Sequence, residues 1–140
     1  MIPKFRAWDK NNKKMFTNEE LIVWNDNVYA NDRRKLTVDK LKGWSVSDKY
    51  LMQFTGICDK HGVRIFEKDI VKFSIDNGSE YVCDGIGFVY YCLGAYRILN
   101  GLDETLINTN AYLISDIDKI EVLGNIYENP ELMEADDDTK

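Results

Sequence analysis

Short apolar runs separated by polar turn residues dominate this chain, and their spacing favours strands over helices. The most informative stretch is residues 50–73, YLMQFTGICDKHGVRIFEKDIVKF, in which two β-branched apolar runs flank the tetrad Asp59-Lys60-His61-Gly62. This arrangement predicts a hairpin. A second chain reversal is expected at Glu67-Lys68-Asp69, leading into a strand over residues 70–73.

The same rhythm continues on both sides of this stretch. Asn77-Gly78 is a strong hairpin signal because both residues accept a positive φ angle, and Leu93-Gly94 predicts another reversal. Asp84-Gly85 and Gly87 predict either a tight reversal or a bulge. Residues 33–44 settle on neither the helical nor the strand period. Other short strands are expected at 4–8, 14–16, 21–24, 28–30, 81–83, 88–91, 95–99, 111–114 and 120–127.

About nine or ten strands at spacings of roughly 8–12 residues are typical of a sandwich or small barrel. The predicted fold class is mainly β (α+β at most), with short antiparallel strands and hairpins forming a small barrel-like or sandwich domain with few short helices. We expect a single domain over 1–132, comprising an N-terminal hairpin region (1–49) and a central barrel-like region (50–127), and an acidic disordered tail at 133–140. The expected core of residues 50–99 comprises Leu51, Phe54, Ile65, Ile70, Val71, Phe88, Val89 and Ile98, with Cys83 packed beside them.

Composition adds an uneven distribution of charge to this picture. The 140 residues are 44% hydrophobic and 30% charged, which is ordinary for a soluble globular protein. No apolar run approaches the roughly 20 residues of a membrane helix, and the first residues lack a secretory signal, so we expect a cytosolic location and no membrane partner. Residues 1–50 carry 11 Lys and Arg against 7 Asp and Glu, net +4, whereas residues 51–140 carry 7 against 17, net −10. Such a division permits attraction between copies.

Metal and thiol chemistry find little support in the sequence. Cys58, Cys83 and Cys92 lie in apolar surroundings and are expected to be small buried hydrophobes. Cys58 and His61 form a C-x-x-H pair, but the eight residues between Cys83 and Cys92 do not fit the short spacing of zinc ligands. A cysteine nucleophile would need His61 as a base and a third group to orient it, and His61 is expected at a hairpin tip. No metal or cofactor is expected.

Carboxylates are the next candidates for catalysis. Glu67, Asp69 and Asp76 lie near one hairpin, and hydrolases place such acids in a cleft. In turns, however, carboxylates are usually solvated or accept hydrogen bonds from turn amides. The sequence has no Walker, G-x-G-x-x-G, G-x-S-x-G or H-E-x-x-H motif. We therefore expect no enzyme activity and assign no catalytic, cofactor-binding or metal residue.

Nucleic-acid binding is the alternative function, because aromatic and basic residues alternate near the N-terminus. Small barrels bind single strands through aromatic platforms and basic grooves. Arg33-Arg34-Lys35 adds a second basic cluster. The competing interpretation puts the two aromatic residues partly in the core and the charges on a solvated face. The N-terminal residues concerned are Phe5, Arg6, Trp8, Lys10, Lys13 and Lys14.

Three segments resemble the YopX family of phage and prophage proteins, in the family's order. They are residues 4–15 (KFRAWDKNNKKM), 50–71 (YLMQFTGICDKHGVRIFEKDIV) and 121–132 (EVLGNIYENPEL). The resemblance implies a small phage-encoded protein made inside a bacterial host, with no established enzymatic activity, that forms a symmetric homo-oligomer. It carries no functional residues across.

This chain departs from the family pattern at two turn positions. Lys68 stands where the family usually has glycine, and His61 stands where it often has asparagine or another turn residue. If position 68 needs a positive φ angle, lysine there costs about 1 kcal/mol or more. The second difference favours a turn role for His61.

The leading hypothesis is a non-enzymatic phage accessory protein in the cytoplasm of the bacterial host that acts by self-association and protein binding. Its partners would be further copies of itself and a host or phage protein. The alternative is a nucleic-acid-binding small β-barrel used in phage replication or regulation. Four tyrosines are expected to be exposed and available to an interface: Tyr29, Tyr50, Tyr90 and Tyr91.

Overall fold

The computed structural model describes residues 2–24, 27–30, 44–46, 50–79, 81–100 and 111–134. Within these ranges the chain has twelve strands, two 3-10 turns and one short helix, which confirms the predicted mainly β class. The chain divides into two compact units, Met1–Phe54 and Thr55–Lys140. A single domain over 1–132 stays a prediction, and residues 33–43 lie outside the described ranges.

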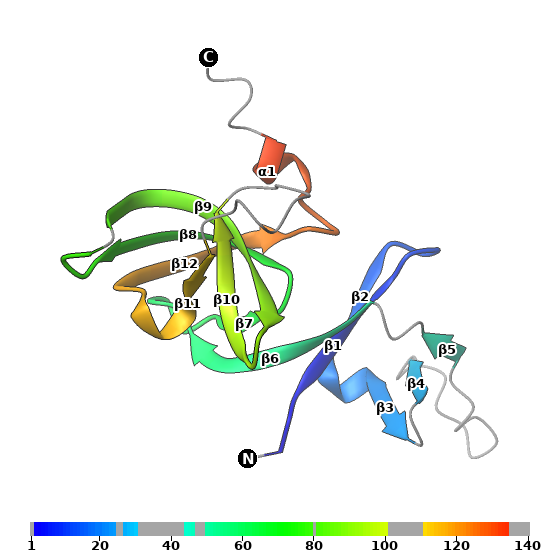
Figure 1. The fold of residues 1–140 in the computed structure, drawn as a ribbon. Coiled ribbons are helices and arrows are strands. Elements are labelled where there is room, and N and C mark those ends of the chain that lie inside the picture. The colour runs from blue at the N-terminus through cyan, green and yellow to red at the C-terminus, as the bar shows by residue number, and fades with distance from the viewer. Residues whose placement is uncertain are drawn as a thin grey trace. The chain divides into compact units, whose positions relative to one another are not determined.

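The first unit is built from hairpins of short strands (Figure 1). Strand β1 pairs with β2, and a separate three-stranded sheet has the order β3-β4-β5. A 3-10 turn over Asn18–Glu20 connects β2 to β3. The Glu20 side chain accepts a hydrogen bond from the backbone N–H of Thr17 at 3.1 Å. The strands are β1 (Phe5–Asp9), β2 (Lys14–Phe16), β3 (Leu21–Trp24), β4 (Asn27–Ala30) and β5 (Trp44–Val46). The core consists of Ala7, Phe16, Val28 and Ala30, with Leu21 and Leu51 packed against it.

Strand β6 (Leu51–Cys58) crosses the boundary between the units. Its first residues pair with β1, with Gln53 opposite Phe5, so they belong to the first unit. Its later residues lie beside β7 (Arg64–Phe66) in the hairpin that the sequence predicts at residues 59–62.

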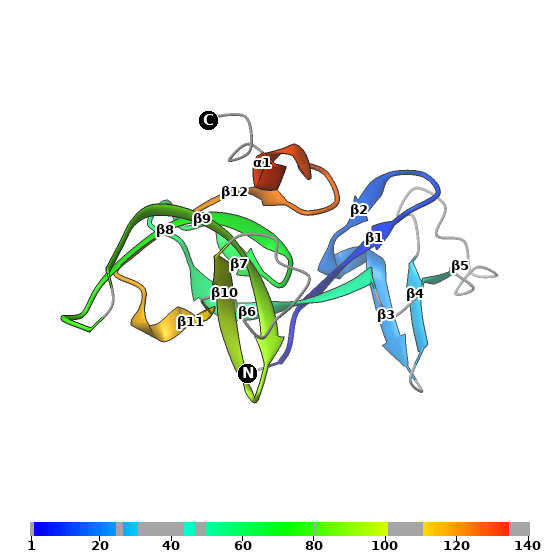
Figure 2. The same ribbon diagram turned by 45° about the horizontal axis from the view of Figure 1, so that its top comes forward.

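The second unit contains a five-stranded antiparallel sheet that curls into a half-barrel (Figure 2). The order β11-β10-β9-β8-β12 brings the last strand of the chain beside the first strand of this sheet. The long strand β9 makes the curl possible, because its residues 81–88 pair with β8 and its residues 87–92 pair with β10. The strands are β8 (Asp69–Asp76), β9 (Tyr81–Cys92), β10 (Ala95–Asn100), β11 (Ala111–Leu113) and β12 (Lys119–Asn125), with a 3-10 turn over Ile114–Asp116 before β12.

A bulge near the start of β9 resolves the two alternatives that the sequence left open at Asp84-Gly85. The register shifts between Phe73 and Ile75 on β8, and β9 continues without reversing. Asp84 has a φ angle of 51°, and its backbone N–H donates to Oγ of Ser74 at 3.1 Å. An extra residue in one strand raises the local twist, so the bulge contributes to the curl of the sheet.

The predicted core is confirmed for five residues, which are Ile65, Ile70, Val71, Val89 and Ile98. Leu51, Phe54 and Phe88 are half-buried. The prediction for Cys83 is wrong, because its side chain is exposed. The bulge interrupts the alternation of inward-facing and outward-facing side chains along β9. Cys83, which the sequence pattern predicts to face inward, therefore faces solvent.

The described part of the chain ends in the short helix α1 (Glu131–Glu134). Met133 in this helix is only 8% exposed. The rest of the tail expected over 133–140 lies outside the described ranges, from residue 135 on. None of the helices in the described residues is long and apolar enough to cross a membrane.

Candidate functional site

The loop between β6 and β7 is organised by the carboxylate of Asp59. Its Oδ1 accepts hydrogen bonds from the backbone N–H groups of His61 at 2.8 Å and Val63 at 2.9 Å. Gly62 has a φ angle of 81° and donates its N–H to the Asp59 carbonyl oxygen at 3.0 Å. This is an Asx-type turn, so the turn role predicted for His61 is confirmed.

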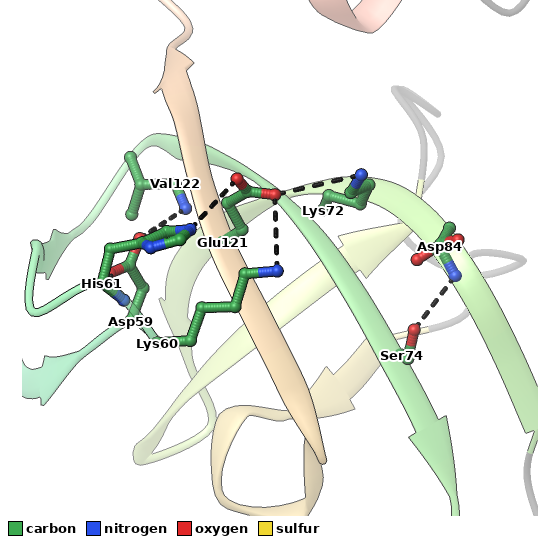
Figure 3. Close-up of polar contacts among 8 residues, drawn as sticks. All are labelled: Asp59, Lys60, His61, Lys72, Ser74, Asp84, Glu121 and Val122. Carbon is green, nitrogen blue, oxygen red and sulfur yellow. Dashed lines mark hydrogen bonds and ion pairs between the residues drawn. The ribbon is translucent and has the colours of Figure 1, made fainter.

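The second oxygen of Asp59 binds the loop to the edge strand β12 (Figure 3). Oδ2 accepts a hydrogen bond from the backbone N–H of Val122 at 3.0 Å, and the N–H of Lys60 donates to the Ile120 carbonyl oxygen at 3.3 Å. Asp59 is 7% exposed. Burial by itself raises the pKa of Asp59, but the three backbone N–H donors outweigh burial and hold the pKa below its ordinary value.

A surface cluster of charges surrounds Glu121 on β12 (Figure 3). Its Oε1 lies 3.5 Å from Nε2 of His61, and its Oε2 lies 3.9 Å from Nζ of Lys72 and 4.0 Å from Nζ of Lys60. All three partners have side chains that are more than two-fifths exposed, so each ion pair contributes little to stability. The cluster can hold the loop in register and present positive charge. Within the described residues, no group of three or more His, Cys, Asp or Glu is placed to hold a metal ion.

The candidate acids do not converge on one cleft. Asp69 and Asp76 are the first and last residues of β8, so a strand rise of about 3.3 Å per residue places them roughly 23 Å apart. Asp69 is 1% exposed, and its Oδ2 accepts the backbone N–H of Phe66 at 2.8 Å across the turn that contains Glu67. Asp69 therefore accepts a hydrogen bond from a turn amide, which is the interpretation that the sequence favours over a catalytic role.

The cysteines are less buried than the sequence predicts. Cys58 and Cys83 are exposed and Cys92 is half-buried, so the prediction is wrong for the first two. Cys58 is the last residue of β6, and the turn begins directly after it.

The N-terminal aromatic and basic residues separate into two environments. Trp8 is 9% exposed and Phe5 is half-buried, whereas Lys10, Lys13 and Lys14 are exposed in and after the β1–β2 turn. Burial of Trp8 removes the strongest stacking surface from the predicted nucleic-acid platform. Residues 33–35 lie outside the described ranges.

A hollow of about 230 Å³ lies beside the bulge, and no pattern in the sequence predicts it. Hydrogen bonding to Cys83 is the largest cause that raises the pKa of the exposed Tyr81 phenol, and the nearby carboxylates of Asp76 and Asp84 raise it further. Asp118 fixes one wall, since its Oδ2 accepts the backbone N–H of Asp76 at 2.7 Å. The lining residues are Ser74, Ile75, Asp76, Tyr81, Val82, Cys83, Asp118 and Lys119.

The β9–β10 turn carries an exposed apolar tip. Leu93 and Gly94 have φ angles of 52° and 79°, which is the pattern of a type I′ turn and confirms the predicted reversal. Leu93 is 87% exposed, and Tyr91 is 56% exposed with its ring centroid 5.1 Å from that of Tyr96. A leucine where this turn prefers Asn or Gly is the signal by which the sequence could have indicated this tip. Of the four tyrosines expected to be exposed, Tyr91 is confirmed, and Tyr29, Tyr50 and Tyr90 are half-buried.

Comparison with known proteins places the chain in a family. The structure of protein EF1440 from Enterococcus faecalis is similar, with 27% sequence identity and a TM-score of 0.56 over 95% of this chain and 99% of that chain. A search of curated proteins gave no match. The family model described as YopX protein matches residues 4–134, a range that contains all three segments that resemble the family. The chain therefore belongs to the YopX protein family.

Proposed function

We propose that this protein is a non-enzymatic phage accessory protein that acts by self-association and protein binding in the cytoplasm of the bacterial host. One observation carries the proposal: the division of charge along the sequence coincides with the division into compact units. Residues 51–54 are uncharged, so the first unit, 1–54, has the net charge of +4 and the second unit, 55–140, has −10.

Opposite charge on two compact units favours contact between copies. The basic unit of one molecule is attracted to the acidic unit of another, which steers encounter and sets which surfaces meet. A contact of this kind can repeat, because each copy carries both surfaces. At physiological salt such attraction is screened beyond about 8 Å, so it selects orientation while buried apolar groups supply most of the affinity.

The positions of the candidate reactive groups support a binding role over catalysis. Asp59 uses both carboxylate oxygens to accept hydrogen bonds from backbone N–H groups, and Oδ2 of the buried Asp69 accepts the backbone N–H of Phe66. His61 faces Glu121 on an exposed surface. Each of these groups has a contact that stabilises a turn or a strand edge.

The test is the molar mass in solution across a salt series. Light scattering at micromolar concentration should give a mass above the 16.3 kDa of one chain, falling as salt rises from about 0.05 to 1 M. The double variant Lys10→Glu, Lys13→Glu should weaken association, and the matched Lys10→Arg, Lys13→Arg variant should not. A mass of 16.3 kDa at every concentration and salt contradicts the proposal.

Nucleic-acid binding is the second candidate, and the exposed lysines of the β1–β2 turn favour it. Phosphate contacts by three lysines would give a steep loss of affinity between about 50 and 200 mM salt. A pull-down from infected host cells, compared with and without nuclease treatment, separates the two. Partners that disappear with nuclease support nucleic-acid binding, and partners that remain support protein binding.

A further inference from the structure

The exposed tip and the hollow lie at opposite ends of β9, as Figure 1 shows for the two turns that flank this strand. Tyr81, Val82 and Cys83 at the start of the strand line the hollow, and Leu93 follows the last residue, Cys92. Both features belong to the second unit and to its five-stranded sheet. A paired strand of this length cannot fold back on itself, so Leu93 cannot reach the hollow of its own chain.

The tip has the properties of a side chain that is buried by a partner. Leu93 has a left-handed φ angle and is 87% exposed. In an isolated copy its side chain therefore stays in solvent and its backbone stays in a strained conformation. Strained backbone and exposed apolar side chains both concentrate at binding surfaces. The neighbouring Tyr91, packed edge-on against Tyr96, gives the tip an aromatic flank.

The hollow has the size and lining that an aliphatic side chain requires. Its volume of about 230 Å³ lies below the range of about 300–1,000 Å³ that is usual for small-molecule sites. Ile75 and Val82 supply apolar walls, and the exposed Tyr81 stands beside them. One leucine side chain with part of its turn fits such a space.

Local charge is complementary between the two ends. Arg97 donates from Nε to the carbonyl oxygen of Cys92 at 3.0 Å, which places a guanidinium directly beside the Leu93 turn. The hollow is lined by Asp76 and Asp118 against a single basic residue, Lys119, so its lining is acidic on balance. This pairing offsets the repulsion expected between two units that are both acidic overall, and it favours a second copy as the occupant.

We propose that Leu93 of one copy inserts into the hollow lined by Tyr81, Val82 and Cys83 of a second copy. The proposal rests on the self-association proposed above and adds to it an apolar contact between the second units of two copies. The contact is heterologous, since different surfaces meet, so it generates a closed ring or an open chain of copies.

A disulfide trap tests the contact directly, because Cys83 already lies in the hollow. Leu93→Cys is made in a Cys58→Ser, Cys92→Ser background and treated with diamide, which accepts the two electrons and two protons released as two thiols form one disulfide. We expect a ladder of linked copies on a non-reducing gel, joined from Cys83 to position 93 as identified by peptide mass spectrometry. The matched control is Leu123→Cys in the same background, since Leu123 is an exposed aliphatic residue on β12.

The outcomes separate the contact from general association. Linkage only between two copies of position 93, or linkage no faster than in the Leu123→Cys control, would overturn the proposed insertion. A second variant, Leu93→Asn, suits a type I′ turn and should keep or raise the thermal unfolding midpoint, while the dissociation constant of the oligomer rises at least tenfold. If Leu93→Asn associates as tightly as the unsubstituted chain, the insertion is wrong and self-association stands. If the unsubstituted chain is a monomer, self-association itself fails.

Discussion

The carboxylate of Asp59 and the backbone N–H of Val122 are joined by a hydrogen bond of 3.0 Å across 63 positions of sequence. Through it the β6–β7 loop is attached to β12, the last strand of the curled sheet. Unpaired strand edges invite unwanted pairing with other chains, and attachment of a loop is one way to cover them. Asp59 therefore links local turn geometry to the closure of the second unit.

Replacing Asp59 tests this link. Asp59→Asn should lower the free energy of unfolding by about 1–3 kcal/mol, because an amide nitrogen cannot accept a hydrogen bond and leaves a buried N–H without its partner. Urea denaturation measures the change. Asp116→Asn, at an exposed position in the second 3-10 turn, is the matched control and should stay within about 0.5 kcal/mol. Equal effects of the two substitutions would show that the Asp59 contacts contribute nothing specific.

Acid should weaken the fold partly through the same carboxylate. The pKa of Asp59 is lower in the folded chain than its ordinary value, so its contribution is complete above the ordinary Asp pKa of about 3.9 and is lost as pH falls through the folded value. Burial by itself raises the pKa of Asp9 and of Glu20 in the first unit, but hydrogen bonds outweigh burial and hold both pKa values below their ordinary values. Urea midpoints between pH 7 and pH 2.5 should fall more steeply for the unsubstituted chain than for Asp59→Asn. Parallel curves would contradict this assignment.

Lys68 occupies a position that the backbone reserves for glycine. Its φ angle is 71°, its N–H donates to the Val89 carbonyl oxygen at 2.7 Å, and its own carbonyl oxygen accepts the N–H of Ile126 at 3.0 Å. These two bonds fix the left-handed conformation despite its cost for a residue with a Cβ atom. The glycine that the family usually carries here thus has a conformational reason.

Lys68→Gly should therefore raise the free energy of unfolding by about 0.5–1 kcal/mol, since relief of strain exceeds the added flexibility of the unfolded chain. Lys68→Ala is the matched control, because it removes the long side chain and keeps the Cβ atom. Equilibrium unfolding in urea should show a gain for glycine alone. A gain of similar size for alanine would mean that the lysine side chain, and not the φ angle, is unfavourable.

Local patterns were sufficient to predict most strands and turns of this chain. The turns at Gly62 and Gly94 follow from residues that accept positive φ angles, and the alternating apolar residues of β8 identify a strand with buried Val71 and Phe73. The hollow and the exposure of Cys83 could not be predicted, because they depend on the exact place where β9 gains one residue against β8. The hydrogen bond from Val122 to the Asp59 carboxylate could not be predicted either, because it depends on how segments that are distant in sequence lie together.

The close approach of β9 and β10 gives the last prediction. A Cβ atom built at Gly87 would clash with the carbonyl oxygen of Leu99 and lie 2.7 Å from Cγ2 of Ile98, whereas one at Gly85 would lie 2.6 Å from Cγ1 of Val82. Backbone cannot move aside as a rotating side chain can, so Gly87→Ala should cost at least about 1–3 kcal/mol and more than Gly85→Ala. Urea denaturation of the two variants ranks them. If Gly85→Ala were the more damaging substitution, this prediction would be wrong. The stability of the half-barrel would then depend more on the bend of β9 at the bulge than on the packing of β9 against β10.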